Sequence, residues 1–320
     1  DYHNKNLATI SYKDTSTTVE PKSKPEINLK IQDDFSNDLS KYYIKSNKEE
    51  KIVDRNWHHI RLVGRLNDNI QNMKLLAEGE LYVFIPSTIK KEMPLVIALN
   101  GWSDKCIKWE TEANISDFGE KNGVIIVLPE MNTTVYEDVF ITENKNNRWC
   151  NDCSIPGLRW VGEIIIPFIN ENIPISNDVN NRMIMGLSTG GEGAVLFTEK
   201  YDYFGLCVSM SGTYDILNLD LNNGEYKIHS RVLGDRQNNL GIWQNQDPTS
   251  NVKKLVGKFV FVIHGKNDNV VPVTQARDFV KVLHNNSIKY KYIEDENSRH
   301  EWKLWKRYLS DVFKILSGKV

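Results

Sequence analysis

Apolar residues recur along the chain in two patterns, short strand-like segments and stripes at helical spacing. Residues 81–85 form a short segment in which aromatic and aliphatic residues alternate, and it ends at Pro86, which predicts a strand of an antiparallel lead-in. Continuous apolar runs follow at 95–99 and 124–128, and such runs are typical of strands buried on both faces of a parallel sheet. Further short strands are predicted at 183–185, 206–210, 259–263 and 290–293.

Helical stripes alternate with these strands. Apolar residues repeat every three or four positions over 158–169 and 273–283, and a third stripe runs from Trp302 to Leu316. This alternation predicts an α/β fold with a mostly parallel, doubly wound sheet and flanking helices. The Asn- and Asp-rich segment 213–257 interrupts the rhythm and predicts an irregular insertion after the sixth strand. A lid, a substrate wall and a surface excursion without a role are all consistent with it.

Residues 1–40 are polar and show no period, which predicts a leader or linker. The remainder, 41–320, is then a single domain with its antiparallel lead-in over 41–90. The formal net charge of −2 indicates no nucleic-acid partner. No apolar stretch approaches the roughly 18 residues of a membrane span. The chain starts at Asp1, so a secreted or extracytoplasmic protein is favoured and a cytoplasmic one stays open.

Cys150 and Cys153 form a C-x-x-C pair without the flanking strand and helix of a redox motif. An incidental pair or a local disulfide is therefore favoured over redox catalysis, and nearby zinc ligands are missing.

The most informative motif is G-x-S-x-G at residues 186–190, with Ser188 at its centre. It follows the strand at 183–185 and precedes small residues that can open a helix. A serine on so sharp a turn presents its hydroxyl to a base, and the two glycines avoid collisions across the turn. The pentapeptide alone recurs by chance, but its flanking pattern is the context that the motif requires. Ser188 is thus a candidate nucleophile; a glycine-rich turn with an incidental serine is the alternative.

A serine nucleophile needs a base, and the base needs an orienting acid, in the chain order Ser, acid, His. His300 follows the last predicted strand by a short polar loop, where strand ends converge. Asp268 lies on a tight turn after the strand at 259–263 and is the predicted acid, although helix capping or turn formation is an alternative role. Asp247 is the main rival acid. Three other histidines follow Ser188 and are less suited to act as the base. His264 ends a strand and is expected to pack or cap a turn, His284 is expected to close a helix, and His229 lies in the insertion.

Acyl transfer also requires donors for the developing oxyanion. The main-chain N–H of Thr189, directly after the nucleophile, is one predicted donor. The N–H of Trp102 is the second, because Gly101 lets the chain turn inward after the strand at 95–99. Trp102 and Trp243 are candidates for lining a substrate pocket, and a structural turn with a core tryptophan is the alternative.

Three segments together resemble a known family: G-L-S-T-G-G-E-G-A around Ser188, H-G-K-N-D-N-V-V-P around Asp268, and H-E-W-K-L-W from His300. They are similar to the esterase family of α/β-hydrolases, which includes S-formylglutathione hydrolase (esterase D), feruloyl and acetylxylan esterases, enterochelin esterases and the antigen 85 mycolyltransferases. The resemblance covers roughly residues 75–318. It implies the α/β-hydrolase fold, the triad Ser188–Asp268–His300, and oxyanion donors at Trp102 and Thr189. Many members have His-Gly where this chain has Asn100-Gly101, so the support of that loop is open.

These residues favour a serine carboxylic-ester hydrolase that forms an acyl-enzyme and needs no metal or organic cofactor. The expected partner is a small-molecule or carbohydrate ester, with the oligomeric state open. An acyltransferase to a sugar or alcohol, an S-formylglutathione-type thioesterase, and a catalytically inactive binding protein on the same fold are the alternatives.

Overall fold

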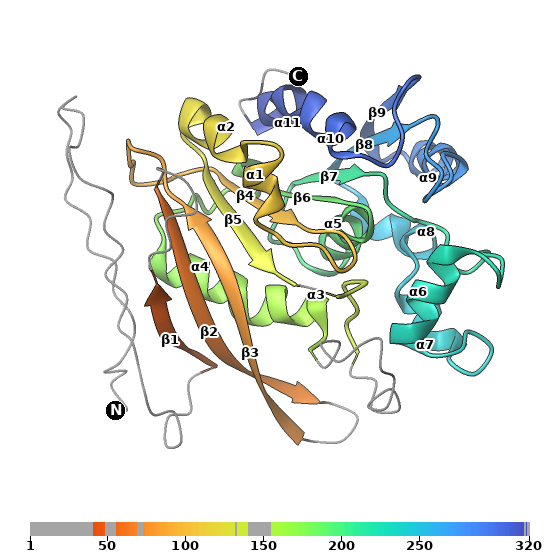
Figure 1. The fold of residues 1–320 in the computed structure, drawn as a ribbon, viewed down its shortest axis with the longest axis horizontal. Coiled ribbons are helices and arrows are strands. Elements are labelled where there is room, and N and C mark those ends of the chain that lie inside the picture. The colour runs from red at the N-terminus through yellow and green to blue at the C-terminus, as the bar shows by residue number, and fades with distance from the viewer. Residues whose placement is uncertain are drawn as a thin grey trace.

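The computed structural model describes residues 41–48, 56–68, 73–131, 133–139, 155–316 and 318. The predicted leader, Cys150 and Cys153 lie outside the described residues. Within them, nine strands form one sheet in the order β1-β2-β3-β5-β4-β6-β7-β8-β9 (Figure 1). The strands are β1 (Tyr42–Lys48), β2 (Trp57–Asp68), β3 (Met73–Phe84), β4 (Leu95–Leu99), β5 (Ile125–Glu130), β6 (Arg182–Leu187), β7 (Leu206–Met210), β8 (Phe259–Gly265) and β9 (Lys289–Asp295).

The sheet is antiparallel at one end and parallel in the rest. β1, β2 and β3 pair antiparallel, and β3 adds antiparallel to β5. From β5 onward every neighbouring pair is parallel. The predicted mostly parallel sheet is therefore confirmed. The lead-in has three strands where the sequence indicated one, so the segment 213–257 follows the seventh strand rather than the sixth.

Helices connect the strands and cover the sheet. They are α1 (Lys108–Thr111), α2 (Ile115–Asn122), α3 (Gly157–Arg159), the π-helical η2 (Trp160–Ile165), α4 (Ile166–Asn172), η3 (Val179–Asn181), α5 (Thr189–Lys200), α6 (Gly224–Leu233), α7 (Leu240–Asn245), α8 (Pro248–Asn251), η4 (Val252–Leu255), α9 (Thr274–Asn285), α10 (Trp302–Arg307) and α11 (Leu309–Leu316).

Alternate residues of the central strands face two separate cores. Ile97 of β4 belongs to the core that contains Phe168 of α4. Its neighbour Val96 belongs to the core that contains Phe313 of α11. Because side chains of a strand alternate between faces, continuous apolar runs serve both cores at once. α2 and α11 lie side by side over the second core (Figure 1), where the rings of Phe118 and Phe313 stack 5.4 Å apart.

The segment 213–257 is helical, so its predicted irregularity was wrong. α6, α7, α8 and η4 all lie within it. The polar residues that suggested a loop instead begin helices: Asn223 accepts a hydrogen bond from the N–H of Glu225 at the start of α6, and Asp247 accepts one from Ser250 in α8. The C-terminal stripe is also divided, because α10 ends at Arg307 and α11 begins at Leu309. Within the described ranges, no helix combines the length and apolar character needed to cross a bilayer.

Candidate active site

Ser188 lies on the turn between β6 and α5, in a conformation that a non-glycine residue rarely adopts. Its φ is 57° and its ψ is −127°. Such a backbone costs about 1–3 kcal/mol and persists only where the surroundings enforce it. A Cβ on Gly186 would lie 2.1 Å from the carbonyl oxygen of Gly190, so the turn tolerates no side chain there. The strand–turn–helix expected around Ser188 is present, with the strain typical of a nucleophile elbow.

Hydrogen bonds hold this elbow to the neighbouring strand end. The N–H of Ser188 donates to the carbonyl of Met210 over 2.9 Å, and the carbonyl of Ser188 accepts from the N–H of Gly191 over 2.9 Å. Met210 is the last residue of β7. The serine is therefore fixed at the carboxyl edge of the parallel strands, where loops from successive strands meet.

His300 and Asp268 form a hydrogen-bonded pair at the same edge. Nδ1 of His300 lies 2.7 Å from Oδ2 of Asp268, whose side chain is fully buried. The other oxygen, Oδ1, accepts the main-chain N–H groups of Val270 and Val271, each over 2.9 Å. Because a carboxylate accepts and does not donate, Nδ1 of His300 carries the proton and Nε2 is left for another partner. The contact predicted between Asp268 and the imidazole is present.

The loops that carry the pair are tied together. The N–H of Asn267 donates to the carbonyl of Ser298 over 3.1 Å, and the N–H of Lys266 donates to the carbonyl of Asp295 over 2.8 Å. The Asp295 carboxylate accepts the hydroxyl of Tyr308 over 2.9 Å. Burial would raise the pKa of Asp295, but hydrogen bonds to its carboxylate, above all from the side chains of Ser298 and Tyr308, lower it to about 2. The charged carboxylate therefore anchors the loop that leads to His300.

A chain of contacts connects this loop with the elbow. The ring of Trp305 packs edge-on against His300, with centroids 5.2 Å apart at 90°. The indole N–H of Trp305 donates to Oγ of Ser211, directly after β7, over 3.2 Å. Among the described residues, no hydrogen bond joins Oγ of Ser188 to His300. Catalytic contacts of this kind commonly tighten only when substrate binds.

Comparison with known proteins finds hydrolases and esterases. Residues 176–313, which contain Ser188, Asp268 and His300, match the model of the prolyl oligopeptidase family. An acetyl esterase of Caldicellulosiruptor saccharolyticus is 27% identical over 233 residues, 68% of this chain and 81% of that protein. The chain is a carboxylic-ester hydrolase of the α/β-hydrolase fold, similar to these proteins.

Solved structures share the fold of this esterase. An S-formylglutathione hydrolase from Agrobacterium tumefaciens superposes with a TM-score of 0.63 at 16% identity, over 86% of this chain and 99% of that chain. A ferulic acid esterase superposes with a TM-score of 0.60 at 17% identity, over 82% and 99%. Identities this low carry the architecture alone.

The loop after β4 passes directly beside the elbow of the esterase. A Cβ on Gly101 would lie 3.2 Å from Cβ of Ser188. The Asn100 side chain, where many family members have histidine, donates from Nδ2 to the carbonyls of Gly101 and Asp104 over 2.8 and 3.0 Å. The carbonyl of Asn100 accepts the hydroxyl of Tyr136 over 2.8 Å. The Asn100 side chain therefore holds the loop through these two hydrogen bonds. Replacement of the histidine found in many family members has not removed the support of the loop.

The two predicted oxyanion donors lie on either side of this contact. Thr189 is the first residue of α5, and Trp102 follows Gly101. In the part of the chain that the structure describes, neither main-chain N–H donates a hydrogen bond to another protein group.

The two candidate pocket tryptophans differ in exposure. Trp102 is half-buried and packs against an apolar cluster of the insertion. Trp243 is fully buried in that cluster, and its indole N–H donates to the carbonyl of Gly234 over 3.0 Å. The expectation that Trp243 lines a substrate pocket is therefore wrong, because its side chain packs in the apolar core between the helices of the insertion.

The rival residues have structural partners. Asp247 accepts hydrogen bonds from the N–H groups of Ile216 and Ser250 over 2.8 and 2.7 Å.

Nε2 of His229 lies 2.9 Å from the carboxylate of Glu192, one turn after the elbow in α5, and both side chains are fully buried. Burial raises the pKa of Glu192 despite the opposing effect of His229. This pair, which the sequence analysis missed, attaches the insertion to the helix that Ser188 begins.

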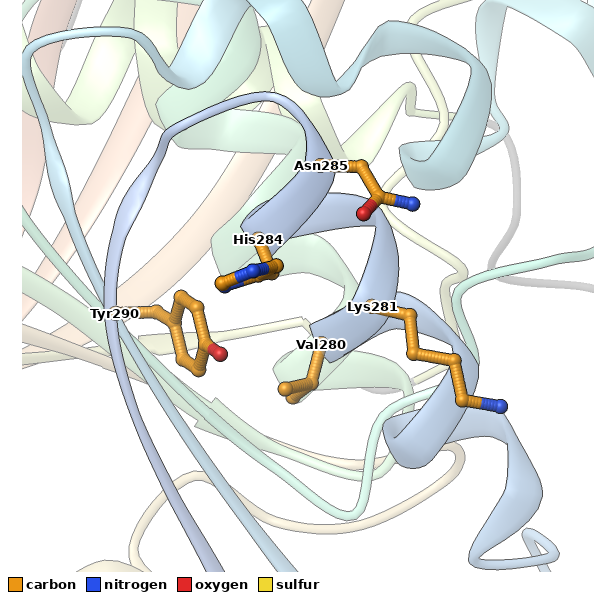
Figure 2. Close-up of a pocket in the computed structure, with 5 residues that line it drawn as sticks. All are labelled: Val280, Lys281, His284, Asn285 and Tyr290. Atoms are coloured by element: carbon orange, nitrogen blue, oxygen red, sulfur yellow. The ribbon is translucent and has the colours of Figure 1, made fainter.

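A hollow of about 480 Å³ lies elsewhere on the molecule. His284 and Tyr290 line it, with Val280, Lys281 and Asn285, from the end of α9 and the start of β9 (Figure 2). Since Asp268 and His300 lie beyond the carboxyl ends of β8 and β9, this hollow is at the opposite end of the strands. His284 closes α9, as expected.

Proposed function

We propose that this esterase hydrolyses carboxylic esters through a covalent acyl-enzyme on Ser188, with His300 as general base and Asp268 as orienting acid. The observation that carries the proposal is the combination of a strained serine at the elbow with a 2.7 Å His300–Asp268 hydrogen bond at the same sheet edge. Strain of this kind is expected where function, and not stability, selects a conformation.

The proposed reaction assigns one task to each side chain. Oγ of Ser188 attacks the acyl carbon while Nε2 of His300 accepts its proton, and the Asp268 carboxylate stabilises the imidazolium that forms. The alkoxide leaves with that proton, and the acyl group stays on the serine. Water then attacks the acyl carbon by the same route, giving up its proton to His300, and Ser188 is released with the free acid.

The main-chain N–H groups of Trp102 and Thr189 would bind the oxyanion of both tetrahedral intermediates. Their support is the approach of the Gly101 loop to Ser188 and the absence of other partners for either N–H among the described residues. Fixed donors aimed at developing charge typically contribute about 10²–10³ in rate each.

We take acyl esters of carbohydrates as the substrate class, with acetyl and feruloyl groups as the acyl parts to test. The relative at 27% identity is named an acetyl esterase, and a structural neighbour is named a ferulic acid esterase. Trp102, half-buried and next to Gly101 on the loop that approaches Ser188, is a suitable face for a sugar ring or an aromatic acyl group.

The test measures hydrolysis of p-nitrophenyl acetate and labelling by a fluorophosphonate probe in Ser188→Ala and in a matched control. Ser87→Ala changes an exposed serine after β3, far from the elbow in the sheet. We expect Ser188→Ala to lose both hydrolysis and labelling, while Ser87→Ala keeps both. Full activity in Ser188→Ala refutes the nucleophile. Absence of labelling in the unmodified protein favours a binding protein on this fold.

A panel of substrates then separates the acyl classes. Acetylated and feruloylated oligosaccharides test the proposed class, S-formylglutathione tests the thioesterase alternative, and added sugar acceptors test acyl transfer by the appearance of transesterified product. The match to the prolyl oligopeptidase family gives a reason to add aminoacyl p-nitroanilides. We expect the highest kcat/KM on an oligosaccharide ester, and a preference for amides would overturn the substrate assignment.

A further inference from the structure

His264 lies at the end of β8 in direct reach of the proposed acid. Its side chain is fully buried, and Nε2 lies 2.9 Å from the carbonyl oxygen of Val271 and 3.4 Å from Oδ2 of Asp268. A carbonyl oxygen only accepts, so in the neutral ring the proton must sit on Nε2. That N–H therefore donates to the Val271 carbonyl, with the Asp268 carboxylate as a second, longer neighbour of the same nitrogen.

The two histidines meet at one carboxylate oxygen. Oδ2 of Asp268 receives Nδ1 of His300 at 2.7 Å, and Nε2 of His264 approaches the same atom, while Oδ1 is held by main-chain N–H groups. Within the described residues, His300 is hydrogen-bonded to this carboxylate, and Nε2 of His264 is the second imidazole nitrogen within 4 Å of it. Burial alone would raise the pKa of Asp268, but the donors from His264 and His300 outweigh it and hold the pKa well below its usual range.

The other nitrogen of His264 argues against a role in packing alone. Nδ1 is buried and, among the described residues, has no hydrogen-bond partner. A buried polar atom without a partner costs about 1–3 kcal/mol, a cost that a phenylalanine or leucine at this position would avoid. The benefit that offsets this cost has to come from the Nε2–H.

We propose that His264 is a positioning residue for the triad acid: its Nε2–H fixes the Asp268 carboxylate from the side opposite His300 and ties the turn at 268–271 to β8. This inference rests on the proposed function, because it acts through the Asp268–His300 pair. His264 itself touches neither substrate nor nucleophile in this arrangement. By sharing Oδ2, it limits how much negative charge the carboxylate offers to His300.

The test compares His264→Gln with His264→Asn on p-nitrophenyl acetate. A glutamine amide reaches the place of Nε2, whereas an asparagine amide stops near the place of Nδ1, so the pair holds the chemistry constant and changes only the reach. We expect His264→Asn to lower kcat about 10–100-fold, the effect of losing a hydrogen bond to a charged group. His264→Gln should recover most of kcat, and KM should stay within about twofold in both, because no group that binds substrate has changed.

A third variant, His264→Phe, keeps the ring and removes both nitrogens. Without the second donor, more charge on Oδ2 is left for His300, which then holds its proton to higher pH. We therefore expect the acid-side midpoint of the kcat/KM profile to move upward, which a purely structural loss would not cause. His58→Phe, at a buried histidine in β2 remote from the site, is the matched control and should leave the profile unchanged.

The outcomes separate this inference from the proposed function. If Ser188→Ala and Asp268→Asn retain activity, the proposed triad itself is overturned. If both lose activity while the Gln, Asn and Phe variants keep an unchanged kcat and pH midpoint, only the positioning role of His264 is overturned. The positioning role is also overturned if the Gln and Asn variants lose kcat equally and the acid-side midpoint of the kcat/KM profile is unchanged in every folded His264 variant. The reach of the side chain to Oδ2 would then not matter.

Discussion

The strain at Ser188 predicts that one inactivating substitution will stabilise the protein while a very similar one will not. Ser188→Gly removes the Cβ that makes a φ of 57° and a ψ of −127° unfavourable. Ser188→Ala removes only the hydroxyl and keeps the Cβ, so the backbone cost remains. Both variants lose the proposed nucleophile, and a difference in their stabilities reports the strain alone.

The size of the effect follows from two opposing contributions. The strained conformation costs about 1–3 kcal/mol in a residue with a side chain. The greater freedom of glycine in the unfolded chain offsets about 0.4–1 kcal/mol of the gain. The net stabilisation of Ser188→Gly over Ser188→Ala is therefore about 0.5–2 kcal/mol. For a chain of 320 residues, with an unfolding entropy of about 2.1 cal/mol/K per residue, this corresponds to a Tm higher by about 1–3 °C.

The assay is thermal unfolding of the three proteins side by side, by calorimetry or circular dichroism, with urea unfolding as a second measurement. Ser188→Ala should melt within about a degree of the unmodified protein, and Ser188→Gly should melt above both. If the glycine variant is no more stable than the alanine variant, the backbone at this residue stores no strain, and the elbow loses its main physical support.

Three further predictions concern the surroundings of the elbow. Asp268→Asn should lower kcat on p-nitrophenyl acetate about 10³–10⁴-fold, because an amide favours the wrong tautomer of His300; a loss below tenfold would contradict the assigned acid. Asn100→Ala should lower kcat at least about tenfold with little change in KM, since the loop that carries one oxyanion donor loses two hydrogen bonds; a change confined to KM would count against this. Burial raises the pKa of Glu137 to about 7, so between about pH 4.5 and 7 the native state keeps a proton that the unfolded chain has lost, and stability falls as pH rises. Glu137→Gln should therefore be more stable than the unmodified protein at pH 8, by up to about 3 kcal/mol in urea unfolding, and equally stable at pH 4.5; a gain independent of pH would exclude this cause.

The elements nearest the chemistry were accessible from the sequence because local rules determine them. The run before Ser188 and the small residues after it specify a strand, a turn and a helix without any distant contact. Asp268 and His300 each follow a strand, and the carboxyl ends of parallel strands necessarily meet at one edge. Their hydrogen bond therefore follows from topology once the strands are assigned.

The insertion was less accessible because its structure depends on tertiary contacts. Asn and Asp are common both in loops and at helix starts, and composition does not separate the two uses. Trp243 could have faced solvent or a core, and only the packing of α6 against α7 decides which. The pairing of Glu192 with His229 joins positions far apart in the chain, so no local pattern predicts it.

The roles of histidines were partly accessible for a related reason. The position of His264 at a strand end predicted a residue that caps a turn, and its bond to Val271 agrees with that. Its approach to Asp268 depends on how the turn at 268–271 folds back over β8, which spacing along the chain does not reveal.

The attachment of the 213–257 segment has a consequence for how proteins of this kind diversify. The Glu192 carboxylate, in the helix that follows Ser188, binds His229 of the segment. Asp247 accepts a hydrogen bond from Ile216 and so connects two parts of the segment itself. With those contacts kept, the exposed surface of the segment is open to change without altering the sheet or the proposed triad. A chimaera that takes residues 213–257 from a relative but keeps a histidine at 229 and an aspartate at 247 is accordingly a practical starting point for redesigning selectivity.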